Sequence, residues 1–416
     1  MKHLNSKSKI SIIGMGYVGL PLAEKLSQHY KVIGFDIDKK RIGYLKKNVD
    51  LNSQISFSQL SSKKIFFTST EENLKDTNLF IITVPTPIFK NKKPDLRPLQ
   101  MASKTVAKYL RKNSIVVYES TVYPGCTKNF CIPILSKFSK LKYNKDFFCG
   151  YSPERINVGD KINTIENIIK IVSGSSPEVS KVIKKVYQKI SIKNNIFLAK
   201  SIEIAEAAKI IENIQRDLNI AFINDILLFA DQMNYNFNEI IRLASSKWNF
   251  LKFKPGLVGG HCLPVDPYYL NYVANLNKVK LKTLLAGRNV NDSMKKFVMK
   301  KVLKKISILK KADNKIKPKV LICGITYKKN VADIRNSLSL QIFLNLRKKY
   351  KNIYAYDYVC ENKILKKYKI KKNLEINKDK YDIVVFLVDH KKNKSIYNYF
   401  KKQKKIIVDP FRLYFK

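Results

Sequence analysis

The stretch Lys9-Ile-Ser-Ile-Ile-Gly-Met-Gly-Tyr-Val-Gly19 joins an apolar run to three glycines in a Gly-x-Gly-x-x-Gly pattern. The apolar run predicts a strand over 9–13, and the spacing of the apolar residues after Gly19 predicts a helix. Glycine permits the tight turn that such a connection requires. A second apolar run over 31–36 ends on an acid, Asp36. This segment is therefore expected to fold as strand, glycine turn, helix and strand.

This order of elements is typical of a dinucleotide site. Glycines let the backbone approach a pyrophosphate, the helix N-terminus stabilises its charge, and the acid accepts hydrogen bonds from the adenosine ribose. The acid favours NAD over NADP, although Lys39, Lys40 and Arg41 beside it weaken that inference. We therefore expect NAD to be the cofactor. The residues expected to hold it are Gly14, Met15, Gly16, Tyr17, Val18, Gly19, Asp36 and Arg41.

Polar turn residues follow two further apolar runs, which predict buried strands over 78–84 and 114–119. In a doubly wound parallel sheet the carboxyl ends of the strands meet at one edge, where ligands bind. Pro85, Thr86 and Thr121 are therefore expected at the cofactor site. Thr86 and Thr121 would also suit a role as turn and capping residues without any ligand.

Two charged side chains, Glu154 and Arg155, are adjacent in the loop 150–160, which contains glycine and proline. An acid beside a base suits the recognition of a polar ligand, but a surface ion pair would give the same pattern. Residues 201–233 lack glycine and proline and have apolar residues at helical spacing, which predicts one long helix. Such a helix often joins two domains and can pair two subunits, so a homodimer is expected.

Lys209 and Asn213 lie four positions apart on one face of that helix, within an otherwise apolar pattern. Two hydrogen-bond donors at this spacing could stabilise an oxyanion above a nucleophile. A solvated helix face would show the same pair of residues.

The stretch 254–269 places Cys262 between a glycine-rich turn and a new helix, whose first turn is expected to include Pro264. At a helix N-terminus the exposed amide groups and the helix dipole favour the thiolate, which is the nucleophilic form. Asp266 follows one helical turn later and could manage protons or orient a water. This spacing predicts a nucleophilic cysteine with a carboxylate beside it. A lone cysteine in an apolar context is also commonly a small buried core residue.

The C-terminal third repeats the strand and helix order, with predicted strands over 319–325, 352–357, 382–388 and 404–409. The lysine-rich segment 307–318 is expected to separate this second parallel sheet from the preceding residues. Its first turn lacks a full Gly-x-Gly-x-x-Gly pattern, so it is expected to bind a nucleotide by other means. Lys328 and Arg335 could contact phosphate there and are counted with the expected cofactor-binding residues, since arginine suits bidentate contact. The predicted fold class is α/β, with two Rossmann-like doubly wound parallel-sheet domains joined by a long central helix.

The formal net charge of the 416-residue chain is +48 at pH 7. A large positive field attracts polyanions, which would suit a nucleic-acid-binding protein with a Rossmann domain. The lysines are spread along the chain rather than gathered in one patch, so solvated lysine faces explain them and no nucleic acid partner is expected. No apolar run reaches the ~18 residues of a membrane-spanning helix, and the first residues lack a signal-peptide core. We therefore expect a cytoplasmic protein without a membrane partner.

The six cysteines show no Cys-x-x-Cys pair and no metal-type spacing with the four histidines. Neither structural zinc nor a disulfide framework is expected, and no metal is predicted. A Ser/His/Asp hydrolase would have to use His261 and lacks the Gly-x-Ser-x-Gly elbow. A two-electron NAD dehydrogenase acting on a hydroxy acid would need only the glycine motif, and it would leave Cys262 without a role.

Together these motifs resemble the UDP-glucose/GDP-mannose dehydrogenase family, the nucleotide-sugar 6-dehydrogenases, along essentially the whole chain. The segments that carry the resemblance, by their order and spacing, are Gly14-Met-Gly-Tyr-Val-Gly-Leu-Pro-Leu-Ala23, Val84-Pro-Thr-Pro87, Glu119-Ser-Thr121, Ser152-Pro-Glu154, Lys209 to Asn213, Gly259-Gly-His-Cys262 with Asp266, and Gly324-Ile-Thr-Tyr-Lys328 to Arg335.

The resemblance implies an NAD-dependent four-electron oxidation of the C6 alcohol of a nucleotide sugar to a carboxylate. It implies that the Cys262 thiolate adds to the aldehyde from the first oxidation, that a second oxidation gives a thioester, and that water releases the acid. By the same resemblance, Lys209 and Asn213 stabilise the oxyanions and Asp266 transfers protons. Thr121 and Glu154 position water or sugar.

The resemblance also implies a substrate site and three domains. The domains are an NAD-binding Rossmann domain over 1–198, a central helical domain with the cysteine loop over 199–310, and a nucleotide-sugar-binding Rossmann-like domain over 311–416. Arg288 could reach the substrate across a dimer interface. The full set of expected substrate residues is Glu154, Arg155, Lys209, Asn213, Phe253, Lys254, Pro255, Gly256, Gly259 and Arg288.

One departure from the family pattern bears on the substrate. UDP-glucose members read Ser-Pro-Glu-Phe-Leu-Arg-Glu-Gly, whereas this chain reads Ser152-Pro-Glu-Arg-Ile-Asn-Val-Gly159 and lacks the second acid. This loop and the run 247–262 are similar to UDP-N-acetylhexosamine dehydrogenases of capsule and O-antigen pathways, including the Vi polysaccharide type. The resemblance therefore ranks UDP-N-acetylglucosamine or UDP-N-acetylgalactosamine first and UDP-N-acetylmannosamine second, with UDP-glucose less favoured.

Overall fold

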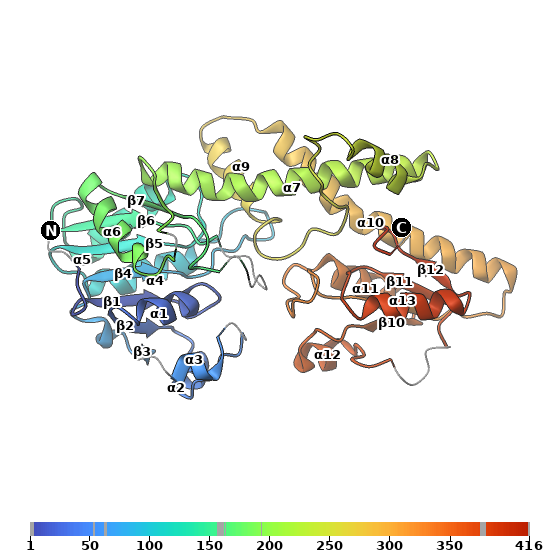
Figure 1. The fold of residues 1–416 in the computed structure, drawn as a ribbon, viewed down its shortest axis with the longest axis horizontal. Helices are drawn as coiled ribbons and strands as arrows, with labels where there is room; N and C mark the ends of the chain where they lie inside the picture. The colour runs from blue at the N-terminus through green and yellow to red at the C-terminus, as the bar shows by residue number, and fades with distance from the viewer. Residues whose placement is uncertain are drawn as a thin grey trace. The chain divides into compact units, whose positions relative to one another are not determined.

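The chain divides into two compact units, and the computed structural model describes residues 4–52, 55–61, 65–155, 162, 164–192, 194–374 and 380–414. The first unit comprises Met1–Glu212 and Tyr268–Val279, and the second comprises Asn213–Pro267 and Lys280–Lys416. The division falls within one helix, α7 (Ile202–Gln232), which confirms the long helix predicted over 201–233 (Figure 1).

The first unit is built on an eight-stranded sheet with the strand order β3-β2-β1-β4-β5-β6-β7-β8. The strands from β3 to β6 in this order run parallel, whereas β7 runs antiparallel to β6 and parallel to β8. The strands are β1 (Lys9–Ile13), β2 (Lys31–Phe35), β3 (Ile65–Thr68), β4 (Leu79–Ile82), β5 (Ser114–Tyr118), β6 (Phe147–Tyr151), β7 (Lys170–Gly174) and β8 (Ile196–Leu198).

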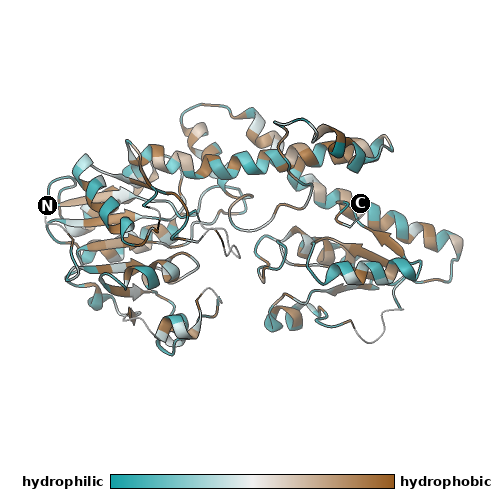
Figure 2. Ribbon diagram, in the orientation of Figure 1, coloured by the Kyte–Doolittle hydropathy of each residue, from teal (hydrophilic) through white to brown (hydrophobic). Residues whose placement is uncertain are grey.

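Helices cover this sheet and bury apolar side chains against it. Strand β4 is wholly buried, which explains its run of four apolar residues, and the strands of both units are drawn as hydrophobic in Figure 2. The helical elements of the unit are α1 (Gly19–Leu26), α2 (Lys39–Lys46), α3 (Phe57–Ser61), the 3₁₀ helix η1 (Glu71–Leu74), α4 (Arg97–Lys108), the π-helix η2 (Thr127–Cys131), α5 (Ile132–Ser139), α6 (Pro177–Gln188) and α9 (Asp266–Leu276).

Two glycines fix the turn between β1 and α1. Gly14 has a φ of +102°, a left-handed conformation that other residues rarely adopt. A Cβ atom on Gly19 would lie 1.9 Å from the carbonyl oxygen of Gly14, so only glycine lets α1 approach the end of β1 this closely. The hydroxyl of Thr83, just beyond β4, donates a hydrogen bond of 2.8 Å to the same carbonyl. The turn predicted from the glycine pattern is therefore formed and held from the next strand.

The second unit contains a four-stranded parallel sheet with the order β10-β9-β11-β12. The two sheets confirm the predicted α/β class with two Rossmann-like parts. The elements of the unit, besides its part of α7, are α8 (Phe237–Ala244), α10 (Lys282–Ala312), β9 (Val320–Cys323), α11 (Leu338–Lys349), β10 (Ile353–Tyr356), α12 (Asn362–Tyr368), β11 (Ile383–Phe386), α13 (Asn393–Lys402) and β12 (Ile406–Val408).

The segment 307–318, which was expected to separate domains, begins inside α10. Val302 and Ile306 are buried one turn apart, and lysine is a good helix former, so the helix continues to Ala312. In the described part of the chain, no helix is both long and apolar enough to cross a membrane.

Candidate active site

The glycine turn of the first unit has the features that a dinucleotide needs. Apart from its two chain neighbours, none of the described residues has an atom within 4 Å of the position that a Cβ on Gly16 would take, so the space in front of this glycine is open for a ligand. The carboxylate of Asp36 accepts a hydrogen bond of 2.7 Å from the amide of Met15, which places the acid beside the turn. The residues of this turn and the N-terminus of α1 fit the pyrophosphate and ribose of NAD.

Arg41, which was expected to contact the cofactor, is buried beside the same turn. Its Nε donates a hydrogen bond of 2.9 Å to the carbonyl of Met15, and its Nη1 lies 2.7 Å from Asp50. The side chain of Asp38 caps α2 by accepting from the amides of Lys40 and Arg41. Arg41 therefore connects the glycine turn to α2. The sequence pattern did not predict this connection.

The polar turns after β4 and β5 meet at one sheet edge, as their positions predicted. The hydroxyl of Thr86 donates a hydrogen bond of 2.6 Å to the carbonyl of Thr121. The hydroxyl of Tyr269, in α9, lies 3.1 Å from the carbonyl of Thr86. Pro85 is exposed in the same segment. The candidate cofactor residues of the two turns are thus joined to one another within the first unit.

Glu206 of α7 holds the turn that follows Thr121. Its carboxylate accepts hydrogen bonds of 2.6 Å from the amide of Gly125 and of 2.9 Å from the amide of Thr127, at the start of η2. Burial raises the pKa of the Glu206 carboxyl to about 7, against the lowering effect of these hydrogen bonds. No pattern in the sequence distinguishes this acid from the other charged residues of the helix.

Glu154 and Arg155 are engaged by different partners. The carboxylate of Glu154 is buried and lies 3.2 Å from Nζ of Lys170, the first residue of β7. Arg155 donates from Nε to Glu212 at 2.8 Å, so the adjacent pair is not a surface ion pair of its own. The remainder of the predicted loop, residues 156–160, lies outside the described residues, including the Ile-Asn pair used to rank the substrates.

Lys209 is buried in α7, with 6% of the residue exposed, which argues against a solvated helix face. Its Nζ lies 3.1 Å from Glu212, which also holds Arg155. Glu212 therefore connects a candidate catalytic lysine to the candidate substrate loop. The sequence offered one signal for it, since Glu212 is three positions after Lys209 on the same helix.

In the second unit Cys262 lies on a loop that is fixed to the turn after β9. The amide of Gly260 donates to the carbonyl of Arg335 at 3.1 Å, and Asn336 donates to the carbonyl of Gly260 at 2.9 Å. Gly260 has a φ of +86°, and a Cβ on Gly259 would lie 2.9 Å from the carbonyl oxygen of Asn336. Cys262 is partly exposed, which excludes the alternative of a fully buried core thiol.

The helix after the cysteine begins later than predicted. Helix α9 starts at Asp266, and Pro264 lies in the turn before it. The carbonyl of Cys262 accepts hydrogen bonds of 2.9 Å from the amides of Val265 and Asp266, and this closes the turn. Pro267 is the second residue of the helix, within the first turn, where the backbone N–H that proline lacks would have no partner inside the helix. The expected order of thiol, helix start and carboxylate is kept.

Asp266 and Asn213 are buried and joined directly. The Nδ2 of Asn213 donates a hydrogen bond of 2.5 Å to Oδ2 of Asp266, and Oδ1 of Asn213 accepts from the guanidinium of Arg216. Asn213 therefore has a partner within the second unit, which argues against a solvated side chain. Arg216 was not identified from the sequence.

The turn before the cysteine loop is held from α7. Asn224 accepts a hydrogen bond of 2.9 Å from the amide of Gly256 and donates one of 3.0 Å to its carbonyl. Phe253 and Pro255 are partly buried, and Lys254 is exposed. The side chain of Asn224 thus holds both the N–H and the carbonyl of Gly256, which fixes the backbone of the turn at this residue.

Arg288 of α10 is 1% exposed and is held by two acids of its own unit. Its Nη1 lies 2.6 Å from Asp217, and its Nη2 lies 2.5 Å from Asp292. Asn291 also donates to Asp217, at 2.8 Å. Burial raises the pKa of the Asp217 carboxyl despite the lowering effect of Arg288. A contact of Arg288 with substrate stays a prediction.

The two candidate phosphate ligands lie in the turn after β9. Lys328 is partly exposed, and its carbonyl accepts from the hydroxyl of Thr326 at 3.1 Å. Arg335 is exposed, and Asp333 accepts from its guanidinium at 2.6 and 2.9 Å. The carbonyl of Arg335 accepts from the cysteine loop, so a ligand bound at this turn would lie on residues connected to Cys262.

Comparison with known proteins agrees with this geometry. The NAD binding domain of the UDP-glucose/GDP-mannose dehydrogenase family matches residues 8–191, its central domain matches 203–293, and its UDP binding domain matches 321–416. The chain is 45% identical to a UDP-N-acetyl-D-glucosamine 6-dehydrogenase of Salmonella typhi, over 93% of this chain and 91% of that protein. It is 44% identical to Protein CapL of Staphylococcus aureus, over 92% and 90%.

A solved structure supports the same assignment. The structure of UDP-D-ManNAc dehydrogenase from Pyrococcus horikoshii superposes with a TM-score of 0.84 at 29% identity, covering 97% of this chain and 96% of that one. The three family domains follow one another along the chain and together match most of it. The chain belongs to the UDP-glucose/GDP-mannose dehydrogenase family.

Proposed function

We propose that this protein oxidises the C6 hydroxymethyl group of a UDP-N-acetylhexosamine to the uronic acid in two NAD-dependent steps. UDP-N-acetylglucosamine and UDP-N-acetylgalactosamine are the first candidates, for capsule or O-antigen polysaccharide biosynthesis. The observation that carries the proposal is the partly exposed Cys262, on a loop pinned to the turn after β9 and one helical turn from the buried Asp266. The names of the relatives from Salmonella typhi and Staphylococcus aureus support this choice of sugar and pathway.

The sulfur of Cys262 makes the four-electron reaction possible. When bound, NAD accepts one hydride in each of the two oxidations. The thiolate forms a bond to the aldehyde carbon produced by the first oxidation, and the resulting oxyanion takes up a proton to give a thiohemiacetal. Its oxidation leaves a thioester, and water then breaks the carbon–sulfur bond to release the carboxylic acid and restore the thiol.

The other candidate residues support this chemistry from fixed positions. Lys209 and Asn213 would donate to the oxyanions, and both are buried, so their donors are worth more than they would be in water. Asp266 would transfer protons, with its carboxylate oriented by Asn213. Thr121 and Glu154 would position water or sugar.

Binding of the nucleotide sugar is assigned to the following groups. The turn from Phe253 to Gly256 and the loop residue Gly259 would enclose the sugar, and the conformation of Gly256 is fixed by Asn224. Lys328 and Arg335 would contact phosphate of the cofactor. Arg155 and Arg288 complete the substrate set. Arg288 is buried against Asp217 and Asp292, so a contact with substrate across a subunit interface would require its guanidinium to leave these acids.

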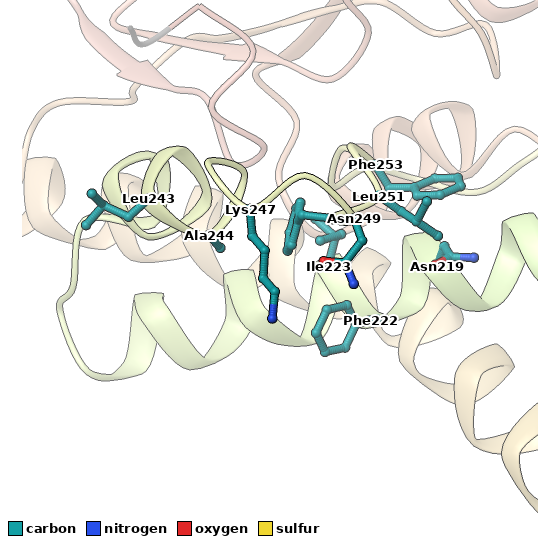
Figure 3. A pocket seen from close by; sticks show the side chains of 10 residues that line it. Asn219, Phe222, Ile223, Leu243, Ala244, Lys247, Asn249, Leu251 and Phe253 are labelled. Atoms are coloured by element: carbon teal, nitrogen blue, oxygen red, sulfur yellow. The ribbon is translucent and has the colours of Figure 1, made fainter.

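We propose that the protein is a homodimer formed through α7 and the segment after it. Phe222 and Phe229 lie seven positions apart on α7 and are more than half exposed. Beside them lies a hollow of about 540 Å³, shown in Figure 3, with lining residues that include Phe222, Leu243 and Leu251. Trp248, in the same segment, is 92% exposed. Exposed apolar side chains of this size in one region are typical of a protein interface, and a second copy of the chain would bury them.

The functions proposed for the three domains follow the order of the family domains. We propose an NAD-binding domain over 1–198, a central domain over 199–310 and a nucleotide-sugar-binding domain over 311–416. We also propose the cytoplasm as the location, because none of the six cysteines forms a disulfide in the described structure, as is usual in a reducing compartment. Neither nucleic acid nor a membrane is proposed as a partner.

Two other candidates remain open to the same experiment. UDP-N-acetylmannosamine is favoured by the name of the Pyrococcus horikoshii structure, and UDP-glucose is less favoured because the second acid of the loop is missing. Purified protein should be given NAD with each UDP-sugar and with GDP-mannose, and both reduced NAD and uronic acid should be measured. The proposal predicts two reduced NAD per acid with a UDP-N-acetylhexosamine. One reduced NAD per turnover, without acid, would instead indicate a simple alcohol dehydrogenase. Salt-sensitive binding to DNA or RNA without NAD reduction would favour the nucleic-acid alternative.

A further inference from the structure

Lys170 is a buried lysine in the first unit to which the proposed reaction gives no role. It is the first residue of β7, in a run of isoleucines and valine, and its side chain is 4% exposed. Strand β7 runs antiparallel to β6, so its first residue lies at the edge where the parallel strands β4, β5 and β6 end. This edge is the one at which ligands bind in such sheets.

The ammonium group of Lys170 contacts two carboxylates that come from the ends of neighbouring strands. It lies 2.9 Å from Oε2 of Glu119, which directly follows β5, and 3.2 Å from Oε2 of Glu154, which follows β6. The hydroxyl of Tyr187, in α6, donates to the other oxygen of Glu119, and the Tyr187 ring lies 5.0 Å from the ammonium. Glu119 is therefore fixed from both sides.

The electrostatics of this cluster require Lys170 to be charged. Burial lowers the pKa of Lys170, but the two carboxylates outweigh that effect and raise it above its usual value. Burial raises the pKa of Glu119, while Lys170 and Tyr187 act in the opposite direction. A buried charge is tolerated only when it is paired and hydrogen-bonded, so the ammonium and the carboxylates depend on one another.

The Glu154 side of the cluster differs from the Glu119 side. The second oxygen of Glu154 accepts a hydrogen bond of 2.6 Å from the backbone amide of Arg155, so both oxygens of the carboxylate are contacted. Of these two contacts, the one from Arg155 comes from the backbone and the one from Lys170 comes from a side chain. A substitution can therefore remove the contact with Lys170.

We propose that Lys170 is a positioning residue that orients the Glu154 carboxylate for hydrolysis of the thioester on Cys262. The inference rests on the proposed function. In this step a water oxygen bonds to the thioester carbon while Glu154 takes one proton from that water. The carbon–sulfur bond then breaks, its electron pair stays on the sulfur as thiolate, and the carboxylic acid is released.

The test compares two variants that differ only at position 170. Lys170→Met alone would leave two buried carboxylates without their cation, so the comparison uses Glu119→Gln with the double variant Glu119→Gln/Lys170→Met. The double variant removes one cation and one anion together and leaves Glu154 in place. Circular dichroism and thermal unfolding should show that both are folded. If the double variant does not fold, Glu119→Gln/Lys170→Gln carries the same comparison with a side chain that can still donate a hydrogen bond.

Three measurements separate a positioning role from a structural one. Relative to Glu119→Gln, the variant without Lys170 should lose about a hundredfold in kcat, since a positioned proton acceptor contributes at least that much, while KM for the sugar nucleotide stays unchanged. The acid limb of its kcat profile should move to higher pH, because loss of the ammonium disfavours the ionised carboxylate. Mass spectrometry of acid-quenched protein should show sugar accumulating covalently on Cys262.

Equal kcat, equal pH profiles and no covalent adduct in the two folded variants would overturn the inference and leave the proposed function intact. An unaltered protein that forms no acid from any of the nucleotide sugars would overturn the proposed function, and this inference with it.

Discussion

The side-chain amide of Asn213 donates a hydrogen bond of 2.5 Å to the carboxylate of Asp266, and both residues are buried. Asp266 begins the helix after the cysteine loop, whereas Asn213 is on the long helix α7. The acid proposed for proton transfer is thus oriented by a residue proposed to stabilise an oxyanion. This coupling means that the two roles cannot be separated by changing Asn213 alone.

We predict that Asn213→Ala lowers both stability and activity. Asp266 would lose a donor in a buried position, which costs about 1–3 kcal/mol of unfolding free energy. The rate of acid formation should fall by a larger factor than the stability loss explains, because an oxyanion donor is lost as well. Urea denaturation and steady-state kinetics measure the two effects. Asn277→Ala is the matched control, since the Asn277 side-chain amide, just after α9, donates to the backbone carbonyl of Val273 on the surface. An active Asn213→Ala protein of unchanged stability would contradict the coupling.

The cysteine loop predicts a difference between two glycines. A methyl group at Gly259 would lie 2.9 Å from a carbonyl oxygen and from the Cβ of Tyr327, whereas none of the described atoms lies within 4 Å of the same position at Gly256. Gly259→Ala should therefore lower the unfolding free energy by about 1–3 kcal/mol, and Gly256→Ala should leave it unchanged. Thermal unfolding of the two variants checks this. Equal melting temperatures would show that the loop is not pinned as described.

The glycine turn predicts a second contrast, between cofactor binding and folding. Gly16→Ala adds a methyl group to the open space in front of the turn, so the protein should fold normally and bind NAD at least about tenfold more weakly. Gly19→Ala would push the methyl group into the carbonyl of Gly14 and should destabilise the protein itself. Isothermal titration with NAD and thermal unfolding distinguish these outcomes. Normal NAD affinity in Gly16→Ala would place the pyrophosphate elsewhere.

Glu206 predicts a pH dependence of stability. Its folded-state pKa of about 7 is above the ordinary value of 4.5, so its contribution to stability is full below about pH 4.5 and is lost as the pH rises through 7. The shift corresponds to about 3 kcal/mol between these limits. Denaturation at about pH 5 and about pH 8 should show this loss in the unaltered protein and a smaller one in Glu206→Gln. Glu203→Gln, one turn away on the same helix, should keep most of the pH dependence, because the charge of Glu203 makes the smallest of the contributions to the raised Glu206 pKa. If the unaltered protein became more stable than Glu206→Gln as the pH rises from about 5 to about 8, the raised pKa of Glu206 would be contradicted.

Periodic and glycine-based patterns in the sequence predicted most of the fold. The strand over 9–13, the glycine turn and the helix over 201–233 are formed as expected, because each depends on local spacing and on burial of a regular apolar face. The lysine-rich segment 307–318 proved to lie partly within α10, because lysine is compatible with a helix whose other face is buried, and its role as a domain boundary stays a prediction. The start of α9 shifted by two residues because the carbonyl of Cys262 closes a turn first.

The residues that orient the candidate site could not be predicted in the same way. Lys170, Glu206 and Glu212 each act through partners far along the chain or on another element, and a single charged residue carries no sign of its future partner. Lys170 was the most visible of them, since a lysine within an apolar strand must be paired if it is buried. The candidate catalytic residues themselves were found because they follow strand ends, glycine turns or fixed helical spacing.

The central claim is that the sulfur of Cys262 carries the sugar between the two oxidations. The most direct measurement is the amount of uronic acid that Cys262→Ser forms from a UDP-N-acetylhexosamine and NAD, with folding and NAD affinity checked on the same preparation. The account predicts a folded protein that binds NAD and forms no acid. Acid formed at the rate of the unaltered protein would contradict it.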